Sequence, residues 1–239
     1  MAKKKKSRVP APPRPAQARE RRVQAPQRRV EHRDGSRSRL WFLVLGAAIL
    51  LVAVGVGVLL GFRGGGNDAV ADGTLGPCVM KTYPPMGRQH VNKLSPGFQY
   101  NSFPPTSGPH YPPGPKAPAV WNIYDSPVDE VALVHNLEHG GVVVQYGSKV
   151  PQSAVALIAQ WYQASPLGMV VAPLPPLRDM HAKAPANAES RIFLTAWTHV
   201  ATCSGFDENT FSKFRDAYRG PGGDAPEKFP LEALQPGGQ

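Results

Sequence analysis

The strongest hydrophobic pattern in this chain is an apolar run without any charged residue over residues 40–62, LWFLVLGAAILLVAVGVGVLLGF. A helix of this length, at about 1.5 Å per residue, is long enough to cross the roughly 30 Å hydrocarbon core of a bilayer. Apolar helices buried in soluble domains usually stop at about 14 residues. The pattern therefore predicts a transmembrane helix over 40–62, with Trp41 placed at the membrane interface.

Beyond this run, the hydrophobic pattern breaks into short segments of two kinds. Residues 152–163 and 208–218 carry apolar side chains at helical spacing, and Asp207 is placed to cap the second of these helices. Short apolar runs predict strands at 119–124, 132–134, 142–146, 169–172 and 192–197. This order of elements predicts an α+β fold in which a small sheet has its helices packed on one face.

Composition divides the chain into further segments. Residues 1–39 are rich in Lys, Arg and Pro and poor in apolar bulk, which predicts a disordered tail. The Gly-rich residues 63–77 predict a flexible linker. Residues 78–219 are numerous enough to form one domain with its own core, and the Gly- and Pro-rich residues 220–239 predict a flexible C-terminal tail.

Charge is concentrated in the N-terminal tail. Residues 1–39 hold 14 of the 27 Lys and Arg and three acidic residues, a net charge of +11, whereas the other 200 residues carry −1. This distribution argues against a nucleic-acid-binding domain. Basic residues before a span favour a cytoplasmic N-terminus, so we expect residues 63–239 outside a plasma membrane and the tail near anionic inner-leaflet lipids. Cleavage of a signal peptide after Ala69–Ala71 is the alternative.

The two cysteines, Cys78 and Cys203, both follow the predicted span. An even number of cysteines in an oxidising compartment favours a disulfide, and closure of so long a loop stabilises by about 4 kcal/mol on the chain-entropy argument. Two unpaired buried thiols are the alternative. The chain contains no C-x-x-C motif, so a thioredoxin-like redox role has no support.

The candidate chemistry lies in residues 131–146, VALVHNLEHGGVVVQY, where His135, Glu138 and His139 interrupt an apolar run. His110 lies upstream on a rigid Pro- and Gly-rich loop. On a helical turn, His135 and His139 would share one face at chelating distance, whereas a straight strand would hold them roughly 13 Å apart. His110, His135 and His139, with Glu138 as ligand or orienting group, form a candidate zinc or copper site. Structural imidazoles that bond the carbonyls of the Pro-rich loop are an equal alternative.

Enzymatic readings have weaker support. His135 to His139 spells H-x-x-E-H, the inverted zincin pattern of a zinc-dependent hydrolase, which requires a long helix. Gly140 and Gly141, followed by a β-branched run, predict that no such helix forms. Ser107 lacks a G-x-S-x-G context, and no feature singles out Asp125, Asp129 or Glu130 as a glycosidase pair. An enzyme is therefore not the favoured expectation.

The stretches YNSFPPTSGPHY, VHNLEHGGVVVQYG, VVAPLPPL and LTAWT resemble the DUF3105 family of bacterial membrane-anchored proteins of unknown function. The resemblance covers most of residues 78–219 and includes His110, His135 and His139. It implies a single-span topology in a bacterial plasma membrane with an extracytoplasmic domain, and it implies little chemistry. An envelope module that docks onto another membrane protein, with structural histidines, is the competing expectation.

Overall fold

The computed structural model describes residues 71–239. The predicted tail at 1–39 and the predicted span at 40–62 lie outside the described residues. Within residues 71–239, no helix combines the length and the hydrophobicity needed to cross a membrane.

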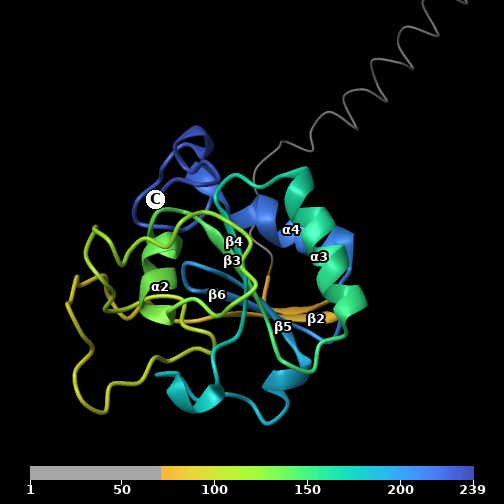
Figure 1. The fold of residues 1–239 in the computed structure, drawn as a ribbon, viewed down its shortest axis with the longest axis horizontal. Coiled ribbons are helices and arrows are strands. Elements are labelled where there is room, and N and C mark those ends of the chain that lie inside the picture. Colours follow the sequence, from red (N-terminus) through yellow and green to blue (C-terminus); the bar gives the residue numbers. More distant parts are fainter. Residues whose placement is uncertain (1–70) are drawn as a thin grey trace, which may run out of the picture. The chain divides into compact units, whose positions relative to one another are not determined.

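A six-stranded sheet forms the centre of the domain (Figure 1). Its strands are β1 Gly73–Leu75, β2 Cys78–Thr82, β3 Val142–Tyr146, β4 Met169–Pro173, β5 Ile192–Ala196 and β6 His199–Cys203. They lie in the order β1-β2-β6-β5-β3-β4, and every neighbouring pair is antiparallel except β3 and β4. The mixed α+β class is therefore confirmed.

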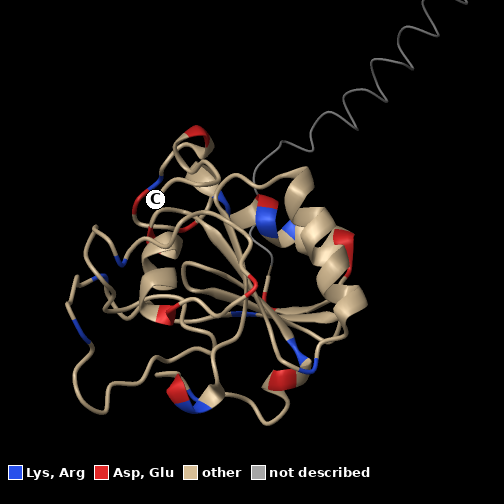
Figure 2. Ribbon diagram, in the orientation of Figure 1, with Lys and Arg blue, Asp and Glu red and all other residues tan. Residues whose placement is uncertain are grey.

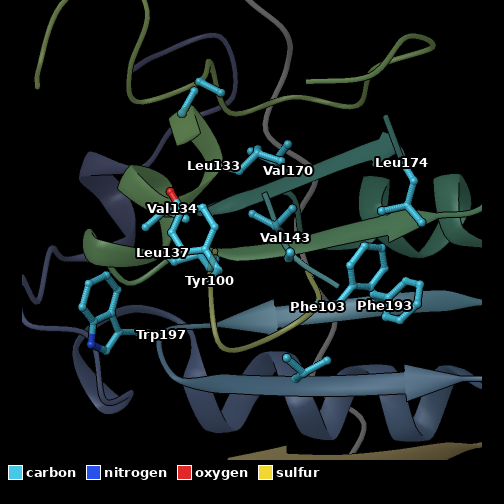
Figure 3. Close-up of a cluster of buried hydrophobic side chains, with 14 of the residues drawn as sticks. Tyr100, Phe103, Leu133, Val134, Leu137, Val143, Val170, Leu174, Phe193 and Trp197 are labelled. Atoms are coloured by element: carbon cyan, nitrogen blue, oxygen red, sulfur yellow. The ribbon is translucent and has the colours of Figure 1, made fainter. Parts of the chain in front are cut away.

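Helices cover both faces of this sheet, so the expectation of helices on one face is wrong. Helix α2, Glu130–Glu138, packs on one face, and helices α3, Gln152–Ala164, and α4, Glu208–Tyr218, pack on the other (Figure 1). Strand alternation explains the two cores: Val143 joins the α2 side, whereas Val142 and Val144 join the α3 and α4 side. Figure 3 shows Leu133, Val134 and Leu137 of α2 beside Val143, Val170 and Phe193 of the sheet.

The predicted elements of the α3 and α4 side are confirmed, including the strands near 142–146, 169–172 and 192–197 and the cap at Asp207. Two predicted strands are wrong. Residues 132–134 belong to helix α2, and residues 119–124 form no strand, although Ile123 makes an isolated bridge to Val171. Short 3-10 helices occur at Leu177–Asp179, Ala188–Ser190, Gly220–Gly222 and Leu231–Ala233.

Both ends of the described chain join the packed unit. Cys78 and Cys203 are register partners on β2 and β6 and form the predicted disulfide, and both are fully buried. Strand β1 falls within the stretch expected to be a flexible linker. The C-terminal residues are not a free tail either: Leu234 is buried and its carbonyl accepts from Gly168, while Gly237 donates to Trp121.

Candidate metal centre

Helix α2 carries the predicted site residues His135, Glu138 and His139 at its C-terminal end. Asp129 begins the helix, its carboxylate accepting from the amide of Val131 at 2.8 Å. The helix ends at a Schellman motif, in which Gly140 donates to Leu137 and Gly141 donates to Asn136. Gly140 has a φ of +86°. His135, Glu138 and the C-cap residue His139 therefore occupy the last helical turn.

Gly140 and Gly141, which end α2, occupy positions where a larger side chain would be strained or would clash. The left-handed φ of Gly140 suits a residue without a Cβ atom. A Cβ atom on Gly141 would lie too close to the Trp121 ring to fit without a rearrangement. This close approach fixes the end of the helix against the core and so fixes the position of its last turn.

Two loop segments place His90 and His110 next to this last turn of α2. The segment around His90 and the segment around His110 run parallel, with hydrogen bonds from Gly108 to Gly87 at 3.0 Å, from His110 to Gln89 at 3.0 Å and from Val91 to His110 at 2.7 Å. The bonded backbone holds the two imidazoles side by side, with ring centroids 4.9 Å apart. His110 is fully buried, whereas the His90 side chain is 42% exposed.

His90, His110 and His135 form a cluster that could hold a metal ion. Each offers one ring nitrogen, and the three nitrogens lie within 4.8 Å of one another. The His90 ring stacks on the His135 ring at 5.2 Å, and the His110 ring meets the His135 ring edge-on at 5.0 Å. The cluster is therefore buried on two sides and open at His90.

The hydrogen bonds of the buried rings define which nitrogen faces the centre. Nδ1 of His110 lies 2.8 Å from the carbonyl oxygen of Gly108, and Nδ1 of His135 lies 2.6 Å from that of Tyr111. Carbonyl oxygens only accept, so each Nδ1 carries the proton and donates. In the neutral ring the lone pair is then on Nε2. Metal-binding histidines are commonly oriented in this way.

The two Nε2 atoms face different partners, a carboxylate for His110 and an imidazole nitrogen for His135. Nε2 of His110 lies 2.9 Å from Oε2 of Glu138, and Nε2 of His135 lies 3.1 Å from Nε2 of His139. Oε2 of Glu138 also lies 3.5 Å from Nε2 of His90. Because Nδ1 of His110 already donates, its Nε2 contact with the Glu138 carboxylate needs a proton or a cation between the two atoms. Nε2 of His139 also lies 3.2 Å from Glu227 and can itself donate to Nε2 of His135. The centre of the cluster is thus electrostatically suited to positive charge.

Burial and the neighbouring charged groups together determine the ionisation of these residues. Burial and the neighbouring His135 lower the pKa of His139 to about 4. Burial also lowers the pKa of His135, against the opposing effect of its bond to Tyr111. For Glu138, burial raises the pKa, but the hydrogen bond and charge of His110, with the charges of His135 and His90, outweigh it and the pKa is lowered. Neutral imidazoles beside a carboxylate ion are the ligating forms of these residues.

The structure thus brings all four predicted residues together, but it groups them differently from the sequence prediction. His110 and His135 join His90 in the cluster, and His90 was missed because the surrounding GRQHV carries no motif. Glu138 borders the cluster through His110 and His90. His139 contacts His135 and also lies 3.2 Å from Glu227 and 4.6 Å from the Phe229 ring, both from the C-terminal segment.

Residues 135–139 are helical, contrary to the expectation that no helix forms at the H-x-x-E-H pattern. These residues lie in the final turn of α2, not on a strand, so His135 and His139 share one face after all. The helix nevertheless stops at once, and Glu138 is bound to His110. The helix C-terminus also directs its negative dipole end toward the cluster, which favours a bound cation.

A family model described as "Protein of unknown function (DUF3105)" matches residues 90–230, a range that includes all five histidine and glutamate positions of the site. No curated protein matches this chain. No solved structure matches it either.

Proposed function

We propose that this chain, which belongs to the DUF3105 family, binds one zinc or copper ion through His90, His110 and His135. Glu138 and His139 border the ion and orient or complete its ligand set. The observation that carries the proposal is the orientation of His110 and His135. Their Nδ1 atoms donate to backbone carbonyls, so their Nε2 atoms carry the lone pairs that can bind an ion, and the Glu138 carboxylate lies 2.9 Å from Nε2 of His110.

The spacing of the donors supports this proposal. Two imidazole nitrogens bound to one tetrahedral zinc at 2.0–2.1 Å lie about 3.3 Å apart. The cluster nitrogens lie within 4.8 Å, so side-chain shifts on the order of 1 Å would bring them to bonding distance. A three-histidine set suits zinc or copper, and the exposed side of His90 gives the ion a route to solvent.

Metal analysis of the purified full-length chain tests the proposal. We expect about one zinc or copper ion per chain after expression in an oxidising compartment, and at least about a hundredfold weaker binding in H110A and H135A. His181→Ala is the matched control, because His181 lies outside the cluster and pairs with Glu130. Metal-free wild-type protein whose melting temperature ignores added zinc and copper would overturn the proposal.

A structural role for the histidines is the second candidate, and one observation favours it. His110 and His135 each tie a loop carbonyl to the core, at Gly108 and Tyr111. In that case H110A and H135A would lower the melting temperature equally with and without metal. A metal-binding cluster instead predicts that the loss is larger when metal is present.

We also propose that a single span at 40–62 tethers this domain to the outer side of a bacterial plasma membrane. The apolar run and the +11 charge before it support this topology, and the buried Cys78–Cys203 disulfide is typical of an oxidising compartment. Protease added to intact spheroplasts should then remove residues 71–239. Full protection of those residues would argue against the topology.

A further inference from the structure

A second polar cluster lies at the opposite end of helix α2. A cleft of about 450 Å³ opens beside the helix N-terminus, and its polar lining consists of Lys93, Tyr111, Asp129, Glu130, Asp179 and His181. Its remaining walls are largely apolar and include Leu94, Val128 and Met180. Acidic residues mark this end of α2 in Figure 2. The cleft is separate in its chemistry from the histidine cluster.

Glu130 is the unusual member of the lining. Its side chain is only 5% exposed. Oε1 accepts from the backbone amide of His181 at 2.5 Å and from Nδ1 of the same residue at 2.8 Å. Oε2 has no hydrogen-bond partner among residues 71–239. A buried carboxylate oxygen without a hydrogen-bond partner is destabilising, so a donor supplied from the cleft would be stabilising.

His181 adds another acceptor to the same cleft. Its Nδ1 faces the Glu130 carboxylate, which only accepts, so Nδ1 carries a proton. The neutral ring then leaves a lone pair on Nε2. The side chain is 45% exposed and lines the cleft, so this nitrogen is within reach of a ligand.

The charges of the lining favour a cation. Three carboxylates face one exposed lysine, Lys93. Asp129 is already engaged by the amide of Val131 and the hydroxyl of Tyr111, whereas the Asp179 side chain is 58% exposed, with Nε of Arg178 3.6 Å from its Oδ1. Burial raises the pKa of Glu130, although its bonds to His181 oppose the shift. A positively charged ligand would therefore stabilise the ionised form of the buried Glu130 carboxylate.

We propose that this cleft binds an alkylammonium group, either on a free amine or on a lysine side chain of a peptide. A primary ammonium carries three donors and can bond Glu130, Asp179 and His181 together, while its alkyl chain lies along Leu94, Val128 and Met180. The proposal does not depend on metal binding, because none of these residues belongs to the histidine cluster.

Ligand-observed NMR titration of the full-length protein in detergent micelles tests this proposal. The probes are pentylammonium and Nα-acetyl-lysine-N-methylamide, with the uncharged Nα-acetyl-norleucine-N-methylamide as the control ligand. We expect saturable binding of an ammonium probe with a Kd of about 1–10 mM, as is reasonable for so small a ligand. Binding of both ammonium probes indicates a free amine as a sufficient ligand, and binding of the lysine probe alone indicates a peptide source.

Three variants and one control locate the site. Glu130→Gln should weaken ammonium binding at least about tenfold, Asp179→Asn about threefold, and Lys93→Gln should strengthen it about twofold. Glu208→Gln removes the same charge on exposed Glu208, which does not line the cleft, and should change nothing. Asp179 and Lys93 are exposed, so their variants decide the matter even where Glu130→Gln fails to fold. Equal binding of the uncharged probe, no saturation by either ammonium, or equal losses in Asp179→Asn and Glu208→Gln would overturn the proposal.

Discussion

The two faces of the sheet differ in how their cover is built. Helices α3 and α4 cover one face with regular amphipathic packing, in which Ile158, Phe211 and Phe214 are buried. The other face is covered by the short helix α2 and by long irregular loops that carry His90 and His110. Every residue of the histidine cluster and of the cleft at the N-terminal end of α2 belongs to this second side. The regular face carries no residue of either candidate site, whereas the irregular face carries both.

The largest expected effect removes core volume from the regular face. Phe211 is fully buried and its ring lies 5.5 Å from Trp161 and 4.9 Å from Phe206. Phe211→Ala should lower the free energy of unfolding by about 3–5 kcal/mol because it leaves a cavity. Chemical denaturation measures this loss. Metal content per folded chain should remain that of the wild type.

The matched change on the irregular face is Leu137→Ala. Leu137 is also fully buried, but it lies in α2 between His135 and Glu138. We expect a loss of about 2–5 kcal/mol together with weaker metal binding, because the cavity loosens the last helical turn. Equal metal affinity in Phe211→Ala and Leu137→Ala would show that the metal site does not depend on packing of the α2 face in particular.

The second prediction concerns metal and stability. Zinc or copper at 100 times its Kd should stabilise the metal-free protein by about 2.7 kcal/mol, since a ligand that binds only the folded state adds stability by mass action. Calorimetry of the chelator-treated protein with and without added ion measures the gain. His135→Ala should abolish it, and Phe211→Ala should retain it. If zinc or copper still stabilised His135→Ala to the same extent, the ion would bind at a site that does not include His135.

The same contrast appears in what the sequence could predict. Helix α4 has apolar side chains on one face and a capping aspartate, so periodicity identifies both its length and its start. Helix α2 is buried along its entire length, so VALV shows no amphipathic period and resembles a strand. Asp129 and the Gly140–Gly141 pair are typical signals for the start and the end of a helix, but the apolar run between them favours a strand prediction.

Two other features lacked a local signal. Strands β5 and β6 join through Trp197 and Thr198, and Thr198 adopts a φ of +65° that short hairpins usually assign to Gly or Asn. His90 reaches the cluster through backbone bonds between two loop segments, which no periodicity encodes. The sequence therefore identified His110, His135 and their helix neighbours as a site, but it could not identify the third histidine.

The third prediction uses pH to examine the irregular face. The pKa of His139 is lowered to about 4 by burial and by His135, while its unfolded value is near 6.5. The unfolded state then binds a proton more readily, so stability is full above about pH 6.5 and falls as the pH drops toward 4. We expect the metal-free protein to lose on the order of 2 kcal/mol across this window. Denaturation curves at several pH values measure the loss.

His139→Gln is the control for this pH effect. It removes the imidazole and should reduce the slope of the stability profile between pH 6.5 and 4, and the slope that remains belongs to His135, whose pKa burial also lowers. Phe211→Ala should shift the profile downward without changing its slope, because its core contains no titrating histidine partner of this cluster. An unchanged slope in His139→Gln would assign the effect to another group.

The smallest expected effects compare the two helix caps. Asp207 accepts from Thr210 at the start of α4, and Asp129 accepts from Val131 at the start of α2. Asp207→Ala should lower Tm by about 2–4 °C and leave metal affinity unchanged, because α4 carries no cluster residue. Asp129→Ala should lower Tm by a similar amount and also weaken metal binding severalfold. Helix α2 has only nine residues, so loss of its first turn by fraying leaves the turn that carries His135 less well held. Thermal denaturation and metal titration of both variants measure the difference. Equal metal affinity in the two would show that the last turn of α2 is held by the Schellman motif and Trp121 independently of its first.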